Sequence, residues 1–309
     1  MELKTLIEKY LNYCELQKGL NLKTIKAYRI DLEQFNTFSK NQKEYSEKVA
    51  ICNFVESLHS NYKPKSIKRK IATLKAFYEY LACEEFISDN PFNKIHLKIK
   101  EPIILPKIIP ERVLTKILNA AYQTLEECKT VYSKRCVIRD IAVLELLFAT
   151  GLRVSELCNL KAEDVNLSDS YIKTFGKGSK ERIIQICTPD VLTALKRYKK
   201  CFKAEIDNTG YFFVNRLSNR LSDQSVRFMI NKYVNQISSP VHVTPHMFRH
   251  TFATMLLESD VDIRYIQQIL GHSSITTTEI YTHVSTAKQK QILKRKHPRQ
   301  KLNVSIKDN

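Results

Sequence analysis

Apolar residues recur at helical spacing through the first hundred residues of the chain. They occupy positions 3, 6, 7, 10 and 11, and then positions 25, 28, 32, 35 and 38. A spacing of three and four residues puts such side chains on one face of an α-helix. Asn21 and Pro64 are start signals for two of these helical stretches, because asparagine and proline favour the first positions of helices. The pattern predicts a small domain of about four helices.

The remainder of the chain mixes helical spacing with a short β pattern. Residues 111–122 and 136–150 have helical periodicity, and the second stretch is so apolar that we expect it in a buried core. Two β-rich runs, YIKTF and ERIIQIC, flank the turn GKGSK between residues 171 and 187, which predicts a hairpin. Thr244 and Pro245 then open a further helix. The chain is therefore predicted to be mainly α with a small β-sheet.

Three prolines mark a boundary between two domains. They stand among β-branched residues at positions 102, 106 and 110, and proline cannot continue a helix, so this segment is expected to be extended. A chain of 309 residues also exceeds what one hydrophobic core usually organises. We expect a helical domain over residues 1–98, a linker over residues 99–110 and a second domain over residues 111–309.

The charge of the chain favours a polyanionic partner. Fifty Lys and Arg residues stand against 32 Asp and Glu, for a net charge of +18. Residues 1–100 hold +6 of this excess and residues 101–309 hold +12, so we expect both domains to contact nucleic acid through phosphate neutralisation. A basic surface that is merely solvated remains the alternative.

Cysteine usage and hydropathy indicate where the protein works. The eight cysteines are scattered without a CxxC pair, which predicts neither a zinc site nor a disulfide framework. No run of eighteen apolar residues occurs, and the first ten residues do not resemble a signal peptide. We expect a soluble cytoplasmic protein with no membrane partner.

Four short motifs hold residues suited to cutting a phosphodiester. They are TGLRVSEL with Arg153, HMFRH with His246 and Arg249, LGHSS with His272, and EIYTH with Tyr281. Two arginines can clamp a phosphate, histidines can share protons, and a tyrosine can attack phosphorus and hold it covalently. The set predicts phosphoryl transfer without a metal or another cofactor, since no cluster of carboxylates for magnesium is visible.

These motifs resemble those of the tyrosine recombinase (phage integrase) family, most closely its Xer-like branch. GLRVSEL, GKGSKER, HMFRHTFAT and LGHSSITTTEIYTH occur in the family's order, and Tyr281 follows His272 by nine residues. The resemblance covers nearly the whole chain. It implies a site-specific DNA recombinase in which a helical core-binding (SAM-like) domain and a mixed α/β catalytic domain clamp DNA. Strands would be cleaved and rejoined through a 3′-phosphotyrosyl intermediate without ATP.

The resemblance also implies roles for individual residues. Tyr281 would be the nucleophile, and Lys177 in the GKG turn would protonate the departing 5′ oxygen. We assign a DNA contact to Lys180 of the same turn. We assign further contacts to four cations of the helix opened by Pro64, namely Lys65, Lys68, Arg69 and Lys75. For the four cations of the helix, a solvated helix face is the competing interpretation.

Alternatives remain for three of the motifs. Lys177 could be a solvated residue of its turn. Arg153 could form a salt bridge with Glu156, three residues along a helix. His246 and His250 have the spacing of a zinc motif, but Met247 stands where that motif requires glutamate. At the level of function, the alternatives are a type IB-like topoisomerase and a non-catalytic DNA-binding regulatory protein.

The C-terminal tail from His283 onward has eight basic residues and one acidic residue. By composition it could be a disordered polycation. The resemblance implies that it docks on a neighbouring protomer, so that a tetramer forms on two paired recombination sites. Residues 123–135 depart from the compact Xer pattern. The biological role therefore stays open between chromosome dimer resolution and integration of a mobile element. Whether a related recombinase or an accessory protein is a partner stays open as well.

Overall fold

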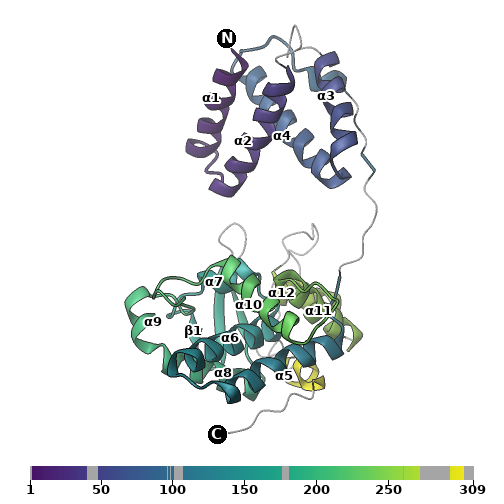
Figure 1. Cartoon of the computed structure of the whole chain (residues 1–309). Helices are drawn as coiled ribbons and strands as arrows, with labels where there is room; N and C mark the ends of the chain where they lie inside the picture. Colours follow the sequence, from purple (N-terminus) through teal and green to yellow (C-terminus); the bar gives the residue numbers. More distant parts are fainter. Residues whose placement is uncertain are drawn as a thin grey trace. The chain divides into compact units, whose positions relative to one another are not determined.

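The chain divides into two compact units, Met1–Ile104 and Leu105–Asn309. The computed structural model describes residues 2–39, 48–95, 97, 99–100, 107–175, 181–259, 261–271 and 293–302. Figure 1 traces the elements of each unit. In the described part of the chain, no helix has both the length and the apolar character needed to cross a bilayer.

The first unit is a helical domain, as the apolar spacing predicted, and its core is rich in aromatic side chains. Its elements are α1 (Leu3–Leu16), α2 (Leu22–Ser39), α3 (Lys48–Asn61), α4 (Pro64–Cys83) and the 3-10 helix η1 (Pro91–Lys94). Pro64 opens α4 as expected. The fully buried rings of Tyr10, Phe35, Phe54 and Phe77 come from all four α-helices and hold them together by burial of apolar surface.

The second unit combines α-helices with a three-stranded antiparallel sheet. The helices are α5 (Glu111–Glu127), α6 (Val131–Thr150), α7 (Val154–Asn159), α8 (Pro189–Cys201), α9 (Lys203–Thr209), α10 (Asp223–Gln236), α11 (Pro245–Glu258) and α12 (Ile263–Leu270), followed by the 3-10 helix η3 (Pro298–Lys301). The strands are β1 (Val165–Asn166), β2 (Tyr171–Phe175) and β3 (Glu181–Gln185), in the order β1-β2-β3. Ile172 pairs with Ile184 across the predicted hairpin, and both side chains are fully buried.

Helix α6 is the central element of the second unit. Its residues from Val137 to Thr150 are buried, apart from Arg139, and it packs against α5, α8 and α11 (Figure 1). The helix begins five residues earlier than the periodicity predicted, because Thr130 and Ser133 form a reciprocal capping box at its start. Residues 123–135 therefore extend α5 and α6 and form the short connection between them.

Candidate active site

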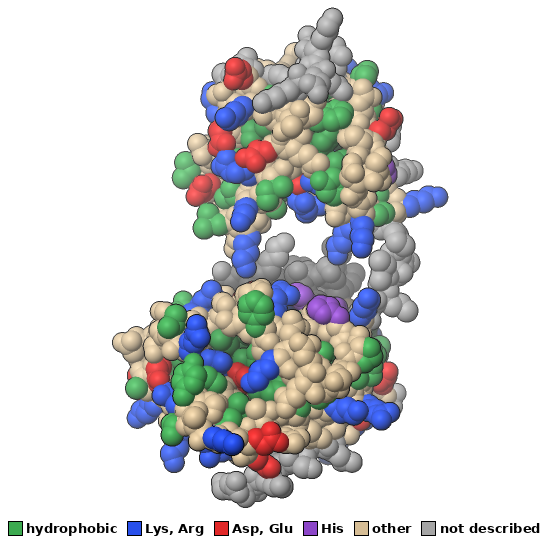
Figure 2. Space-filling model, in the orientation of Figure 1, with side chains coloured by type: hydrophobic (Ala, Val, Ile, Leu, Met, Phe, Trp, Pro, Cys, Tyr) green, Lys and Arg blue, Asp and Glu red, His purple; other side chains and the backbone are tan. Residues whose placement is uncertain are grey.

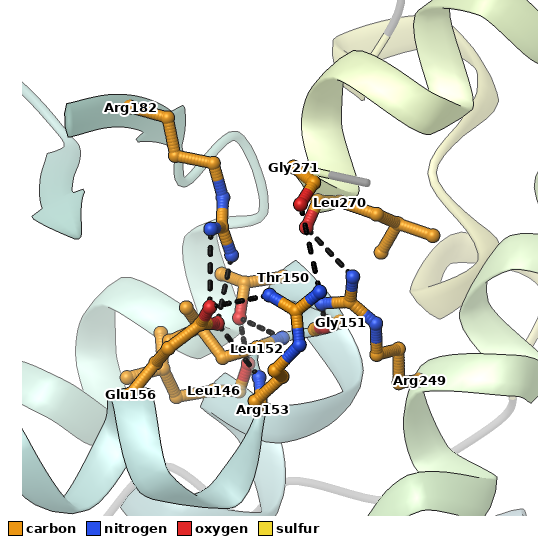
Figure 3. Close-up of polar contacts among 10 residues, drawn as sticks. All are labelled: Leu146, Thr150, Gly151, Leu152, Arg153, Glu156, Arg182, Arg249, Leu270 and Gly271. Carbon is orange, nitrogen blue, oxygen red and sulfur yellow. Dashed lines mark hydrogen bonds and ion pairs between the residues drawn. The ribbon is translucent and has the colours of Figure 1, made fainter. Parts of the chain in front are cut away.

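Arg249 is buried where the ends of α6 and α12 meet α11. Its side chain is 4% exposed, and its Nη1 and Nη2 atoms donate to the carbonyl oxygens of Gly151 at 2.8 Å and Leu270 at 2.7 Å (Figure 3). Burial, reinforced by the positive charge of Arg153, lowers the pKa of Arg249 to about 10. The guanidinium therefore stays charged at neutral pH and is held rigidly by two backbone carbonyls.

Gly151 allows this close approach. It ends α6 in the left-handed conformation, with φ of 60°, which glycine adopts at helix ends without the steric cost of a Cβ atom. A Cβ atom here would lie 2.7 Å from side-chain atoms of both Leu270 and Phe252. The turn therefore needs glycine for its conformation and for the space that α11 and α12 occupy beside it.

Arg153 lies at the N-terminus of α7, two residues after this turn. Its Nη1 atom donates to Glu156 Oε1 at 2.7 Å, and its Nη2 atom approaches the carbonyl oxygen of Gly271 at 3.5 Å. The salt bridge to Glu156, an alternative in the sequence, is therefore present. It orients Arg153 without burying it, since 31% of the side chain remains exposed.

Arg182 joins the cluster from strand β3, and the sequence assigned it no role. Its Nη1 and Nη2 atoms donate to the two carboxylate oxygens of Glu156 at 3.1 Å and 2.8 Å (Figure 3). Its guanidinium also lies against Gly271, where an added Cβ would be 2.7 Å from Nη1. Both partners fall inside the recognised motifs GLRVSEL and GKGSKER, which was the signal available for finding them.

The three arginines and Glu156 together have a net positive charge, which favours an anionic ligand. Besides burial, the positive charges of Arg153 and Arg182 lower the pKa of Arg249, and the negative charge of Glu156 raises it. Against the effect of burial, Arg182 and Arg153 in turn lower the pKa of Glu156. In the described cluster, three guanidinium groups are offset by one carboxylate. Such planar, permanently charged donors suit the non-bridging oxygens of a phosphate.

Glu156 gives this cluster a testable dependence on pH. Burial alone would raise the pKa of this carboxyl, but hydrogen bonds and charge from Arg182 and Arg153 hold the pKa below its usual value. A folded-state pKa below the unfolded one adds stability that is present at neutral pH and is lost as pH falls through the folded value.

We therefore expect Glu156→Gln to lower the free energy of unfolding at pH 7 by about 1–3 kcal/mol, since it leaves charged donors poorly paired. Urea unfolding would measure this difference, which should shrink on acidification because wild-type Glu156 becomes protonated. The exposed Glu163 provides the control Glu163→Gln. A difference that is independent of pH would contradict the linkage.

His246 lies in the first turn of α11, three residues before Arg249. Partial burial lowers its pKa, and the positive charges of Arg227, Arg249 and Arg153 lower it further. The imidazole is therefore neutral at pH 7, the form that can accept a proton. Burial also lowers the pKa of His250, with His246 as the next cause. Within the described ranges, no three His, Cys, Asp or Glu side chains form a group suited to a metal ion.

The other predicted catalytic residues lie outside the described residues. These are Lys177, His272 and Tyr281, and the predicted DNA contact Lys180 lies there as well. Gly271, which approaches Arg153, is the residue directly before His272 in the sequence. The structure thus brings Arg153, His246 and Arg249 together.

The four predicted DNA contacts on α4, Lys65, Lys68, Arg69 and Lys75, are all exposed. Arg69 differs from an ordinary solvated cation because it forms an ion pair with Asp31 of α2, whose side chain is 1% exposed. Lys70 Nζ lies 2.9 Å from the other oxygen of the same carboxylate. The buried carboxylate of Asp31 therefore orients Arg69. Figure 2 shows Lys and Arg side chains spread over the visible surface of each unit.

Comparison with known proteins gives matches across both units. A sequence model described as the phage integrase family matches residues 111–288, and one described as phage integrase, N-terminal SAM-like domain, matches residues 7–85. A tyrosine recombinase of Agathobacter rectalis is 55% identical over 298 residues, which cover 96% of this chain and 97% of that protein. The tyrosine recombinase XerC of Thermodesulfovibrio yellowstonii is 38% identical and covers 94% of this chain and 96% of its own length.

Solved structures show the same fold. A XerH recombinase bound to palindromic difH DNA after cleavage has a TM-score of 0.69 at 21% identity and covers 91% of this chain and 82% of its own. A lambda integrase tetramer bound to a Holliday junction has a TM-score of 0.65 at 19% identity and covers 90% of this chain and 76% of its own. The helical unit and the mixed unit therefore have known counterparts.

Proposed function

Because this chain belongs to the phage integrase family and is a tyrosine-type site-specific DNA recombinase, we propose that it cuts and rejoins DNA through a 3′-phosphotyrosyl intermediate. The observation that carries the mechanism is the arginine cluster, in which Arg153 and Arg182 pair with Glu156. Arg249 is held beside them by the carbonyl oxygens of Gly151 and Leu270. In phosphoryl transfer, fixed cations stabilise negative charge on the non-bridging oxygens of the transition state. This cluster supplies such charge from protein side chains, so we propose a reaction that needs neither metal nor ATP.

In the proposed cleavage step, the Tyr281 oxygen bonds to phosphorus and the bond from phosphorus to the 5′ oxygen breaks. The phenolic proton passes to a histidine, and the neutral state of His246 suits this role. Lys177 donates a proton to the departing 5′ oxygen, while His272 hydrogen-bonds the phosphate. A phenol with a pKa of about 10 is a poor nucleophile at pH 7, which is why it needs a nearby acceptor and a cationic pocket.

The reverse step rejoins DNA without an external energy source. The phosphotyrosyl bond retains the energy of the phosphodiester, so a 5′ hydroxyl from another strand can displace Tyr281. We propose that this exchange takes place in the cytoplasm, in a tetramer that pairs two sites. A lambda integrase forms a tetramer bound to a Holliday junction, which supports this assembly. Lys65, Lys68, Arg69 and Lys75 would contact the phosphate backbone, together with Lys180.

The proposed function is tested by covalent capture. The full chain is incubated in EDTA with a nicked duplex containing a candidate site from its own locus, and denaturing gels reveal any adduct. An adduct supports metal-free tyrosine cleavage. Tight binding without an adduct would favour a regulatory DNA-binding protein, and cleavage without joining of two sites would favour a type IB-like topoisomerase. Assays on paired sites within one DNA and on two separate DNAs would separate resolution from integration.

A further inference from the structure

Arg153 and Arg182 reach Glu156 from different elements, α7 and β3, and they differ in exposure. The side chain of Arg153 is 31% exposed, whereas those of Arg182 and Glu156 are 12% and 6% exposed. A phosphate that arrives from solvent can therefore reach the guanidinium of Arg153 more readily than that of Arg182. The two arginines are suited to different tasks, contact with the anion for Arg153 and support of its surroundings for Arg182.

Both oxygens of the Glu156 carboxylate are shared between the two arginines. Oε1 accepts from Nη1 of Arg153 at 2.7 Å and from Nη1 of Arg182 at 3.1 Å. Oε2 accepts from the backbone N–H of Arg153 at 2.9 Å and from Nη2 of Arg182 at 2.8 Å. Because the planar fork of Arg182 bonds both oxygens at once, it fixes the plane of the carboxylate. Arg182 therefore sets the direction in which Glu156 presents its acceptors to Arg153.

The charge of Glu156 depends more on Arg182 than on Arg153. Burial alone would raise the pKa of the Glu156 carboxyl, and the hydrogen bonds and charge of Arg182 make the largest contribution that lowers this pKa. The bonds from Arg153 come next. An ion pair between residues three apart on a helix is weak by itself. The local pair of Arg153 and Glu156 therefore relies on a partner from a distant strand.

A second group that approaches Arg153 also touches Arg182. The carbonyl oxygen of Gly271 lies 3.5 Å from Nη2 of Arg153. The guanidinium of Arg182 packs against the same glycine, where an added Cβ would be 2.7 Å from its Nη1 atom and 3.1 Å from its Cζ atom. Figure 3 shows Arg182, Glu156 and Gly271 around the guanidinium of Arg153. Arg182 therefore supports both the carboxylate and the carbonyl that approach Arg153.

The backbone of Arg182 is itself held in place by the sheet. Arg182 pairs with Thr174 across β2 and β3, and the neighbouring pair of Ile172 and Ile184 is fully buried. A side chain on a packed strand is placed more precisely than one on a loop. Strand β3 can therefore transmit a fixed position to Arg153 through Glu156.

We propose that Arg182 is a positioning residue of the active site, which fixes the guanidinium of Arg153 through Glu156 and Gly271. The inference rests on the proposed function, in which Arg153 stabilises negative charge on the phosphate that is transferred. Arg182 does not touch this phosphate. It holds in place the groups that orient Arg153.

The test compares variants of the full chain in single-turnover adduct formation on the nicked duplex at saturating protein. Arg182→Met should slow adduct formation by about 10²-fold, the loss expected when a catalytic group is slightly misplaced. DNA affinity should stay unchanged, because Arg182 makes no phosphate contact. Arg182→Lys keeps the charge beside Glu156 but lacks the fork, so it should recover part of the rate. Arg197→Met is the matched control, because Arg197 is an exposed arginine of α8 in the same unit.

A double-mutant cycle tests action through Arg153. Arg153→Met removes the cation that Arg182 is proposed to orient. In that background, the further change Arg182→Met should cause little additional loss of rate, because the effects of residues that act as a unit are not additive. If the two losses multiply, Arg182 acts independently of Arg153, and the inference is overturned.

Urea unfolding of each variant separates positioning from folding. If Arg182→Met fails to fold, Arg182→Lys takes its place in both comparisons, and a wild-type rate in that variant overturns the inference. A wild-type rate in folded Arg182→Met, or a loss of DNA affinity equal to the loss of rate, overturns it as well. These outcomes leave the wild-type adduct in place. Absence of an adduct from wild-type protein on DNA that it binds would instead overturn the proposed function itself.

Discussion

Tyr281→Phe should bind recombination-site DNA as tightly as wild-type protein and form no covalent adduct. The substitution removes one hydroxyl oxygen and no charge, so phosphate contacts by lysine and arginine are kept. Without that oxygen no phosphotyrosyl bond can form, and neither the arginines nor His246 can replace it. Gel-shift titration measures the affinity, and a denaturing gel of the nicked substrate measures the adduct.

Tyr132→Phe is the matched control, because Tyr132 is 61% exposed near the start of α6. This variant should form the adduct at the wild-type rate. A persistent adduct in Tyr281→Phe would show that another of the fifteen tyrosines is the nucleophile, which peptide mapping of the adduct would identify.

Arg249→Lys should lower the rate of adduct formation by about 10²–10³-fold, the usual loss when one donor to a transition-state oxygen is removed. Lysine keeps the positive charge, but its single ammonium cannot reproduce the planar fork that reaches the carbonyls of Gly151 and Leu270 together. The charge would then no longer be fixed where α6, α11 and α12 meet. Single-turnover cleavage at saturating protein measures the effect apart from DNA binding.

Arg216→Lys is the control for this prediction, since Arg216 is an exposed arginine of the same unit. It should leave the cleavage rate unchanged. An unchanged rate in folded Arg249→Lys would instead mean that charge without fixed geometry suffices, and would contradict the role assigned to Arg249.

Much of the fold was predictable because it depends on neighbours in the sequence. Apolar spacing located the helices of the first unit, and the apolar stretch 136–150 was correctly expected in the core. The start of α6 was misplaced because a capping box between Thr130 and Ser133 outweighs the weak periodicity of the preceding residues.

Part of the candidate site was also predictable. Arg153, His246 and Arg249 were chosen from local motifs, and the structure brings them together. Arg182 was missed because its importance comes from Glu156, 26 residues away. The catalytic roles of Arg153, Lys177, His246, Arg249, His272 and Tyr281 all stay predictions, and the variants above address those of Tyr281 and Arg249.

The sequence by itself determined the helical and hairpin segments and the set of chemical groups available for phosphoryl transfer. Each depends on interactions within a few residues, or on the chemistry of one side chain. Only the tertiary structure decided which charges are paired. Glu145 and Arg299 are 154 residues apart in the sequence, yet they form a buried ion pair between α6 and the basic C-terminal segment. A buried charge needs a partner of opposite charge, which the fold can bring from any part of the chain. The spacing of residues in the sequence therefore does not reveal which distant residues will pair.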